Sequence, residues 1–157
     1  MRILFACLVA LFLSSSALAE VDSFPIEVKG NTLNIRAGAT RAEITGMLKK
    51  AFGAEEPSVA SAERLQYDYV AKPGEGPLAL MFDFNKAGVL VGLSIDANMK
   101  QQNPVAVKLL DWLKQNAGAG KKQGKSTRWE KSGFVFKLKE VKDAGDDSSY
   151  GFEISKK

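Results

Sequence analysis

The sequence predicts an α+β domain, an antiparallel sheet of five to seven strands with two helices packed on one face. Residues 78–97 alternate apolar and polar side chains on either side of a short turn, which indicates a β-hairpin. Residues 40–52 and 103–117 place apolar side chains three and four positions apart, which indicates two amphipathic helices. Short connections between the other strands favour antiparallel pairing.

The hairpin segment 78–97 has the sequence LALMFDFNKAGVLVGLSIDA. Apolar residues recur there at every second position, Leu78, Leu80, Phe82 and Phe84 in the first strand and Val89, Val91, Leu93 and Ile95 in the second. This alternation places each set on one face of a strand. Residues 85–88 supply the turn, because Asn and Gly tolerate the backbone of a tight reversal. An isolated hairpin is marginal in water, so we expect another layer to cover it.

Both predicted helices have start and stop signals. Thr40 suits the N-cap of the first helix, and Glu43 three residues later completes a capping box. Asn103 suits the N-cap of the second helix, with Pro104 at the favoured first position. A glycine follows each helix, at positions 53 and 118, where a left-handed stop is expected.

The segments outside the hairpin and the helices complete the sheet. Residues 20–29, continued by 31–35, are expected to add an edge strand, because Pro25 cannot donate a ladder hydrogen bond. Residues 54–63 and 119–127 are expected to be loops, the second one flexible and basic. Further strands are expected at 64–71, 128–131, 134–141 and 149–155, with a tight turn at 132–133 and a polar reversal at 143–148. Within 134–141, Lys137 and Lys139 are expected to face outward.

The first nineteen residues have the pattern of a secretory signal peptide, which we expect to be cleaved. Arg2 gives a positive start, residues 3–13 form an apolar run too short to span a bilayer, and Ala17 and Ala19 precede the expected cut before Glu20. We therefore expect a periplasmic protein with a single α+β domain over residues 20–157 and no transmembrane segment. No lipid anchor is expected, because the residue after the cut is not cysteine.

Cleavage would limit the available chemistry. Cys7 lies in the apolar run, and the chain has no histidine. The remaining 138 residues would hold neither thiol nor imidazole, so we expect no Cys or His nucleophile, no metal site and no cofactor. Their net charge of +3 favours acidic partners slightly and does not indicate a nucleic-acid binder.

Residues 35–44, IRAGATRAEI, have the form I-x-x-G-x-T-x-x-E-[IV]. A helix end at 48–53, Tyr-Asp-Tyr at 67–69, the strand 80–84 and Gly-Val-Leu at 88–90 follow it. Over residues 35–96 this pattern resembles the small outer-membrane assembly lipoproteins of the SmpA/OmlA type, and the layout is similar to that of the β-lactamase inhibitor protein. The resemblance implies an α+β module that presents its sheet or its loops to another protein of the cell envelope. Glu20 stands where the lipoproteins carry an acylated cysteine, and residues 103–157 have no counterpart.

Residues 120–126, GKKQGKS, look at first like a phosphate-binding loop. That motif requires a glycine five residues before Gly124, and position 119 is alanine. The segment also follows a predicted helix, whereas a phosphate-binding loop joins a strand to a helix. Nucleotide binding is therefore not expected.

Basic residues in and after this segment form a candidate contact surface. Lys121, Lys122, Lys125 and Arg128, next to Trp129, could meet lipid phosphates, glycan carboxylates or an acidic protein surface. The alternative is a solvated loop without a ligand. Trp129 alternates with charged neighbours, so its side chain is expected to point inward.

Carboxylates offer no convincing site in the sequence. Residues 83–94 begin like a calcium loop, but Ala87 and Ser94 occupy two ligand positions. Asp143, Asp146 and Asp147 are expected to form a polar turn rather than a cation site. No pair of acids is placed across a cleft, and no S-x-x-K pattern lies on a predicted helix.

These observations predict a non-catalytic, exported protein that binds another envelope or secreted protein, as an inhibitor, an immunity-type antagonist or an envelope-assembly accessory. The alternative is a binder of anionic lipid or glycan through residues 119–128. A carboxylate-based hydrolase is the third hypothesis. Nucleic acid is not an expected partner.

Overall fold

Twelve elements follow one another in the computed structural model, which describes residues 22–98, 100–142 and 148–157. They are β1 (Ser23–Val28), β2 (Asn31–Arg36), α1 (Arg41–Phe52), β3 (Val59–Ala60), β4 (Arg64–Tyr69), β5 (Leu78–Phe84), β6 (Leu90–Ile95), α2 (Pro104–Ala117), β7 (Lys121–Gln123), β8 (Ser126–Lys131), β9 (Phe134–Lys142) and β10 (Ser148–Lys156). The α+β class and both helices are confirmed. The expected signal peptide, 1–19, and the three aspartates expected in a polar turn, Asp143, Asp146 and Asp147, lie outside the described residues.

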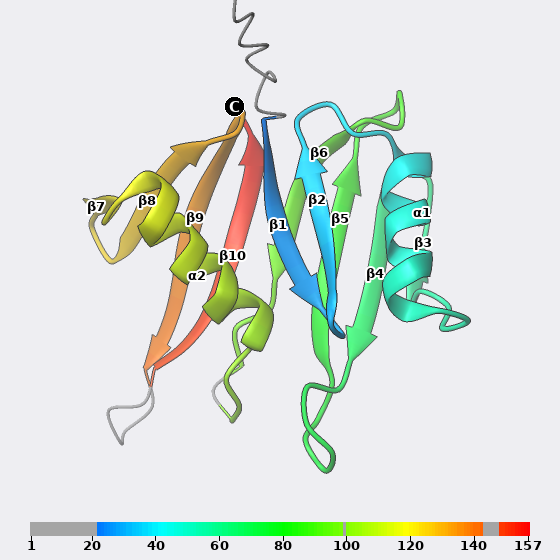
Figure 1. Ribbon diagram of the computed structural model, residues 1–157, viewed down its shortest axis with the longest axis horizontal. Coiled ribbons are helices and arrows are strands. Elements are labelled where there is room, and N and C mark those ends of the chain that lie inside the picture. The colour runs from blue at the N-terminus through cyan, green and yellow to red at the C-terminus, as the bar shows by residue number, and fades with distance from the viewer. Residues whose placement is uncertain (1–21, 99, 143–147) are drawn as a thin grey trace, which may run out of the picture.

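Eight strands form one antiparallel sheet in the order β3-β4-β5-β6-β10-β9-β8-β7 (Figure 1). The expected number was five to seven. The difference arises at the edges, where β3 has two residues and β7 has three. Strands this short carry too little alternation to be recognised in a sequence.

The strands β1 and β2 form a separate two-stranded sheet, so the predicted edge strand at 20–35 is wrong. Lys29 and Gly30 form the turn between them, with φ angles of 50° and 75°, and the hairpin lies in front of the large sheet between the two helices (Figure 1). Helix α2 packs against β1, and α1 packs against β2. The reason is burial: each strand turns an apolar row toward the large sheet, while the opposite side is half-buried in β1 and exposed in β2.

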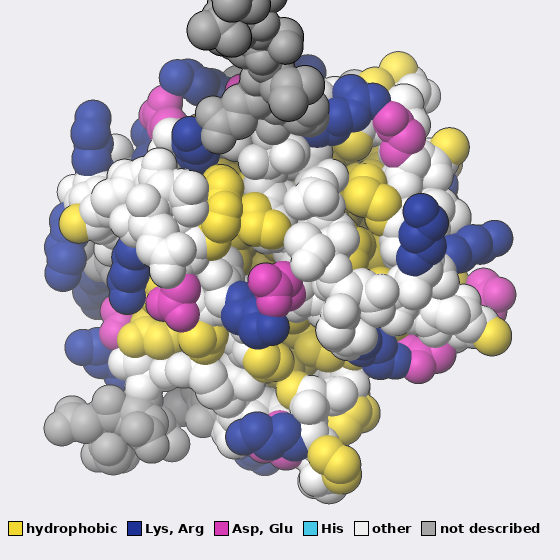
Figure 2. Space-filling view, viewed as in Figure 1, with side chains coloured by type: hydrophobic (Ala, Val, Ile, Leu, Met, Phe, Trp, Pro, Cys, Tyr) yellow, Lys and Arg dark blue, Asp and Glu magenta, His cyan; other side chains and the backbone are white. Residues whose placement is uncertain are grey.

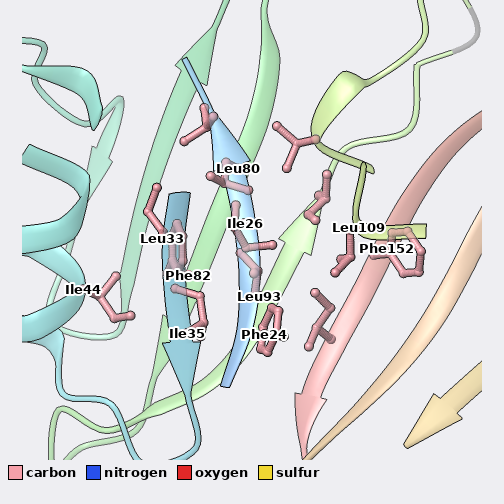
Figure 3. Close-up of a cluster of buried hydrophobic side chains, with 14 of the residues drawn as sticks. Phe24, Ile26, Leu33, Ile35, Ile44, Leu80, Phe82, Leu93, Leu109 and Phe152 are labelled. Atoms are coloured by element: carbon pink, nitrogen blue, oxygen red, sulfur yellow. The ribbon is translucent and has the colours of Figure 1, made fainter. Parts of the chain in front are cut away.

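The core lies between this second layer and the large sheet (Figure 3). Phe24 of β1 is fully buried and meets the rings of Phe134 and Phe136 on β9 edge to face, at centroid distances of 5.0 and 4.9 Å. Edge-to-face pairs add about 0.5–1.5 kcal/mol to the free energy gained from burial alone. These contacts fix the hairpin to the sheet.

A β-bulge changes which residues of β6 point into the core. The partner of Asp83 is Gly92, but the partner of Phe84 is Leu90, so Val91 is an extra residue on β6. As a result Leu90 is buried, whereas Val91 is 36% exposed. The expectation that Val91 shares a face with Leu93 is therefore wrong.

The predicted loop at 119–127 is also wrong in part. Lys121–Gln123 and Ser126–Lys131 pair as an antiparallel hairpin, with Gly124 and Lys125 as its two-residue turn. Gly124 has φ 59°, which suits the first turn position of a tight hairpin. Lys121 and Lys122 are therefore held on a strand, and Lys125 lies in the turn.

Both N-caps are confirmed. On α1 the hydroxyl of Thr40 accepts the amide of Glu43 at 3.3 Å, and the Glu43 carboxylate accepts the Thr40 amide at 2.7 Å. These hydrogen bonds, with the nearby guanidinium of Arg36, lower the pKa of Glu43 from 4.5 to about 2. Among the described residues, neither helix has the length and apolar character needed to cross a bilayer.

Candidate functional site

One face of the large sheet carries no second layer among the described residues, and we call it the open face. On the central strands Leu93 and Ile154 point into the core and are at most 3% exposed, whereas Ser94 and Glu153 point the other way. The register and the alternation place on this face Gln66, Met81, Asp83, Gly92, Ser94, Glu153, Ser155, Val135, Lys137, Lys139, Arg128, Glu130 and Lys121. Most of these residues are polar or charged, so the face is a solvated surface.

A hollow of about 440 Å³ crosses the open face from Asp83 on β5 to Gln123 on β7. Its centre lies over β6 and β10, where the side chains are small, at Gly92, Ser94 and Ser155. A Cβ atom at Gly92 would lie 3.5 Å from the Ile154 carbonyl oxygen, an ordinary contact. The backbone therefore does not require glycine at this position, and the absence of a side chain keeps the floor of the hollow low.

Ion pairs border the hollow on both sides. On the β4–β5 side, Arg64 Nε lies 2.7 Å from Asp83 Oδ1. On the β9–β10 side, one carboxylate takes two lysines: Glu153 lies 2.8 Å from Lys139 Nζ and 3.3 Å from Lys137 Nζ. These hydrogen bonds, that from Lys139 foremost, lower the pKa of Glu153. Glu153 is therefore an anion at neutral pH and still leaves one positive charge in excess.

A second carboxylate on β8 is shared in the same way. Glu130 lies 2.7 Å from Lys157 Nζ and 2.9 Å from Arg128 Nη2. The hydrogen bond from Lys157 is the main cause that lowers the pKa of Glu130, and the charges of Arg128 and Lys121 lower it further. Two acids on this half of the open face thus hold four cations.

The structure separates the predicted contact residues. Lys121 is the register partner of Arg128, so both side chains lie on the open face. Lys122 pairs with Thr127 and lies on the opposite side of the sheet, while Lys125 occupies the hairpin turn. Only two of the four predicted basic residues therefore share one surface.

Trp129 points inward, as predicted, and is 4% exposed. Its indole nitrogen donates to the Gly118 carbonyl oxygen at 2.9 Å, at the end of α2. Gly120 lies flat against the ring, since a Cβ there would come within 2.5 Å of it. A second hollow of about 450 Å³ adjoins this ring, with Lys121 and Arg128 in its lining. Trp129 therefore anchors the β7–β8 hairpin on α2.

Sequence reasoning missed Gly92, Ser94, Ser155 and Glu153 as surface residues, because they form no motif and come from strands far apart in the chain. The order β6-β10-β9 brings them together, and pairing between distant strands is not visible in local patterns. One signal was present. The alternation of 134–141 placed Lys137 and Lys139 outward, on the face that borders the hollow.

Two carboxylates line the hollow, Asp83 and Glu153, and a carboxylate-based hydrolase would need such a pair to act together on one bond. Their backbones lie two strands and two residues apart, a Cα separation of about 12 Å for ordinary sheet spacings. A general acid needs a raised pKa, but the lysines lower the pKa of Glu153. Among the residues that the structure describes, no cluster of His, Cys, Asp or Glu could hold a metal ion.

Comparison of the chain with family models, with curated proteins and with solved structures finds no match.

Proposed function

We propose that this protein is an exported, non-catalytic binding module that contacts another envelope or secreted protein through its open face. The observation that carries the proposal is the one-sided covering of the sheet: helices and hairpin bury one face, and the described residues leave the other free. The resemblance over residues 35–96 to envelope proteins, which implies a module that presents its sheet or its loops to a partner, agrees with this role.

The size of the open face supports a protein partner. Eight strands at spacings of about 4.8 Å, with strand lengths of about 20 Å, give a projected area of roughly 700 Å². A stable protein interface buries roughly 600–1,000 Å² on each partner. The face is thus large enough for a standard interface, whereas its hollow is shallow and open.

The composition of the layered face argues against it as the main contact surface. Figure 2 shows this side, where Lys, Arg, Asp and Glu side chains are interspersed among small apolar areas. Lys108 of α2 pairs with Glu27 of β1 across it. The two signs are balanced on this side: residues 22–120, which include both helices and the hairpin, carry no net charge, so this face offers a partner no potential of one sign.

Site-specific photo-crosslinking tests the proposal. A photoreactive amino acid is placed at Ser94 or Ser155 on the open face and, as matched controls, at Lys50 of α1 or Lys114 of α2, all in the full chain expressed with its own N-terminus. We expect a covalent adduct of one mass from both open-face positions and no such adduct from the controls. Adducts from the helix positions alone, or from none of the four, would contradict the proposal.

A second candidate function is binding of anionic lipid or glycan through residues 119–128, and the positive charge of this part of the chain favours it. Residues 121–142 contain eight Lys or Arg against two Glu, a net charge of +6. If this function holds, changing Lys121, Lys122 and Lys125 together to Gln should abolish retention on acidic vesicles or on peptidoglycan. Unchanged retention would exclude it.

A further inference from the structure

The positive charge of the chain is concentrated at one end of the large sheet. Residues 22–120 contain eleven Lys or Arg and eleven Asp or Glu, so their net charge is zero. Residues 121–142, which form β7, β8 and β9, carry a net charge of +6. These three strands are adjacent at one edge of the sheet, so positive side chains gather there.

Five cations lie on or next to the open face, around two carboxylates: Lys121, Arg128, Lys137, Lys139 and Lys157. Glu153 is shared by Lys137 and Lys139, and Glu130 by Arg128 and Lys157, with Lys121 beside Arg128. Five positive charges against two negative ones leave an excess of three on this half of the face. The excess borders the hollow, because Arg128 and Lys137 belong to its lining.

The cations on the face can change partners at little cost. The side chains of Lys137 and Lys139 are 55% and 46% exposed, and that of Arg128 is 36% exposed. Ion pairs this exposed contribute little to the stability of a fold. Arg128 also keeps Nε buried without a hydrogen-bond partner among the described residues, so its guanidinium is held only by Glu130.

We propose that the open face binds an acidic segment of the partner protein, which lies across the hollow with its carboxylates at Arg128, Lys137 and Lys139. This inference rests on the proposed function and names the chemistry of the partner. Charge complementarity selects the segment, and the low floor at Gly92, Ser94 and Ser155 gives its backbone room.

A protein segment fits this surface better than a membrane does. A bilayer surface is flat, and docking it on a hollowed sheet face would leave the floor uncovered. The cations also project beside two fixed carboxylates, which repel a dense layer of phosphates but tolerate a few well-placed acids. Lys122 and Lys125, which a membrane would reach at the hairpin tip, lie off this face.

The test measures binding of a fluorescent hexaglutamate peptide to the full-length protein by anisotropy at low ionic strength. Charge reversal of two open-face lysines, Lys137→Glu with Lys139→Glu, is compared with Lys50→Glu plus Lys114→Glu on the helices, which changes the net charge equally. We expect at least tenfold weaker binding for the first pair and less than threefold for the second. Equal losses of binding in both double variants would mean that binding depends only on net charge, which would overturn the proposal.

A second arm identifies the class of partner. Amide chemical-shift changes on adding the peptide should map to β6, β9 and β10 around Ser94 and Lys137. Cosedimentation with phosphatidylglycerol vesicles, without any peptide binding, would overturn the proposal in favour of lipid. If the Ser94 crosslink forms but excess hexaglutamate does not compete with it, the acidic partner is wrong while the binding face stands. If no crosslink forms, the proposed function itself fails.

Discussion

Replacing Asn103 by alanine should destabilise the protein far more than loss of a helix cap alone. Asn103 is fully buried at the start of α2, where its Oδ1 accepts the amide of Val105 at 3.1 Å. The same oxygen accepts the hydroxyl of Tyr69, on β4, at 2.6 Å. Its Nδ2 donates to the Asp96 carbonyl oxygen at 2.8 Å, after β6. One side chain therefore joins α2 to two regions of the sheet.

The expected cost follows from these bonds. Loss of an N-cap costs about 1 kcal/mol. The hydroxyl of Tyr69 would remain buried without a partner, which adds about 1–3 kcal/mol. Burial raises the pKa of Tyr69, so the hydroxyl stays protonated at neutral pH and needs an acceptor. We expect Asn103→Ala to lower the free energy of unfolding by about 2–4 kcal/mol.

The control is the other N-cap. Thr40 is exposed, so the groups that Thr40→Ala releases are hydrated and the loss should be about 1 kcal/mol. Urea unfolding followed by tryptophan fluorescence gives both values. A difference of less than about 0.5 kcal/mol between the two variants would show that the buried partners of Asn103 contribute nothing to stability. A cycle with Tyr69→Phe should show coupling of about 0.5–3 kcal/mol with Asn103→Ala.

Three further predictions concern packing and pH. Gly151→Ala should lower the free energy of unfolding by about 1–3 kcal/mol, because its Cβ would lie 2.6 Å from the Ile95 carbonyl oxygen. Gly92→Ala, whose Cβ has room, should lower it by well under 1 kcal/mol, and urea unfolding of the two variants measures the difference. Phe24→Ala should cost about 3–5 kcal/mol in the same assay, and a loss below 1 kcal/mol would show that the hairpin is not fixed by this ring. Glu43 has a lowered pKa, so its contribution to the free energy of unfolding is complete above pH 4.5 and is lost as the pH falls toward about 2. The difference in unfolding free energy between the natural protein and Glu43→Gln should therefore shrink to zero over that pH range. A difference that stays constant would contradict the lowered pKa.

Local features of the fold could be predicted from the sequence because they depend on neighbours in the chain. The capped helices, the strand pattern of 78–84 and the inward Trp129 all follow from spacing within a few residues. The bulge at Val91 could not be predicted, because alternation is the same with or without an extra residue until the partner strand is known.

The candidate site depends on pairing between strands distant in sequence, and that pairing decided which residues meet. The predicted basic set was contiguous in the chain, but the pleat divides Lys121 from Lys122. The hollow arises where β10, the last strand, inserts between β6 and β9 and brings Ser155 next to Gly92. Local periodicity contains no information about that insertion.

Lysine footprinting in the cell envelope tests most directly whether the open face is the contact surface. The purified protein and the protein in its host's envelope fraction, to which the proposed export would deliver it, are briefly acetylated, and the reaction of each lysine is followed by mass spectrometry. We expect Lys137 and Lys139 to react several-fold more slowly in the envelope fraction, while Lys108 and Lys114 on α2 react at unchanged rates. Protection of the α2 lysines with full reactivity at Lys137 and Lys139 would contradict it.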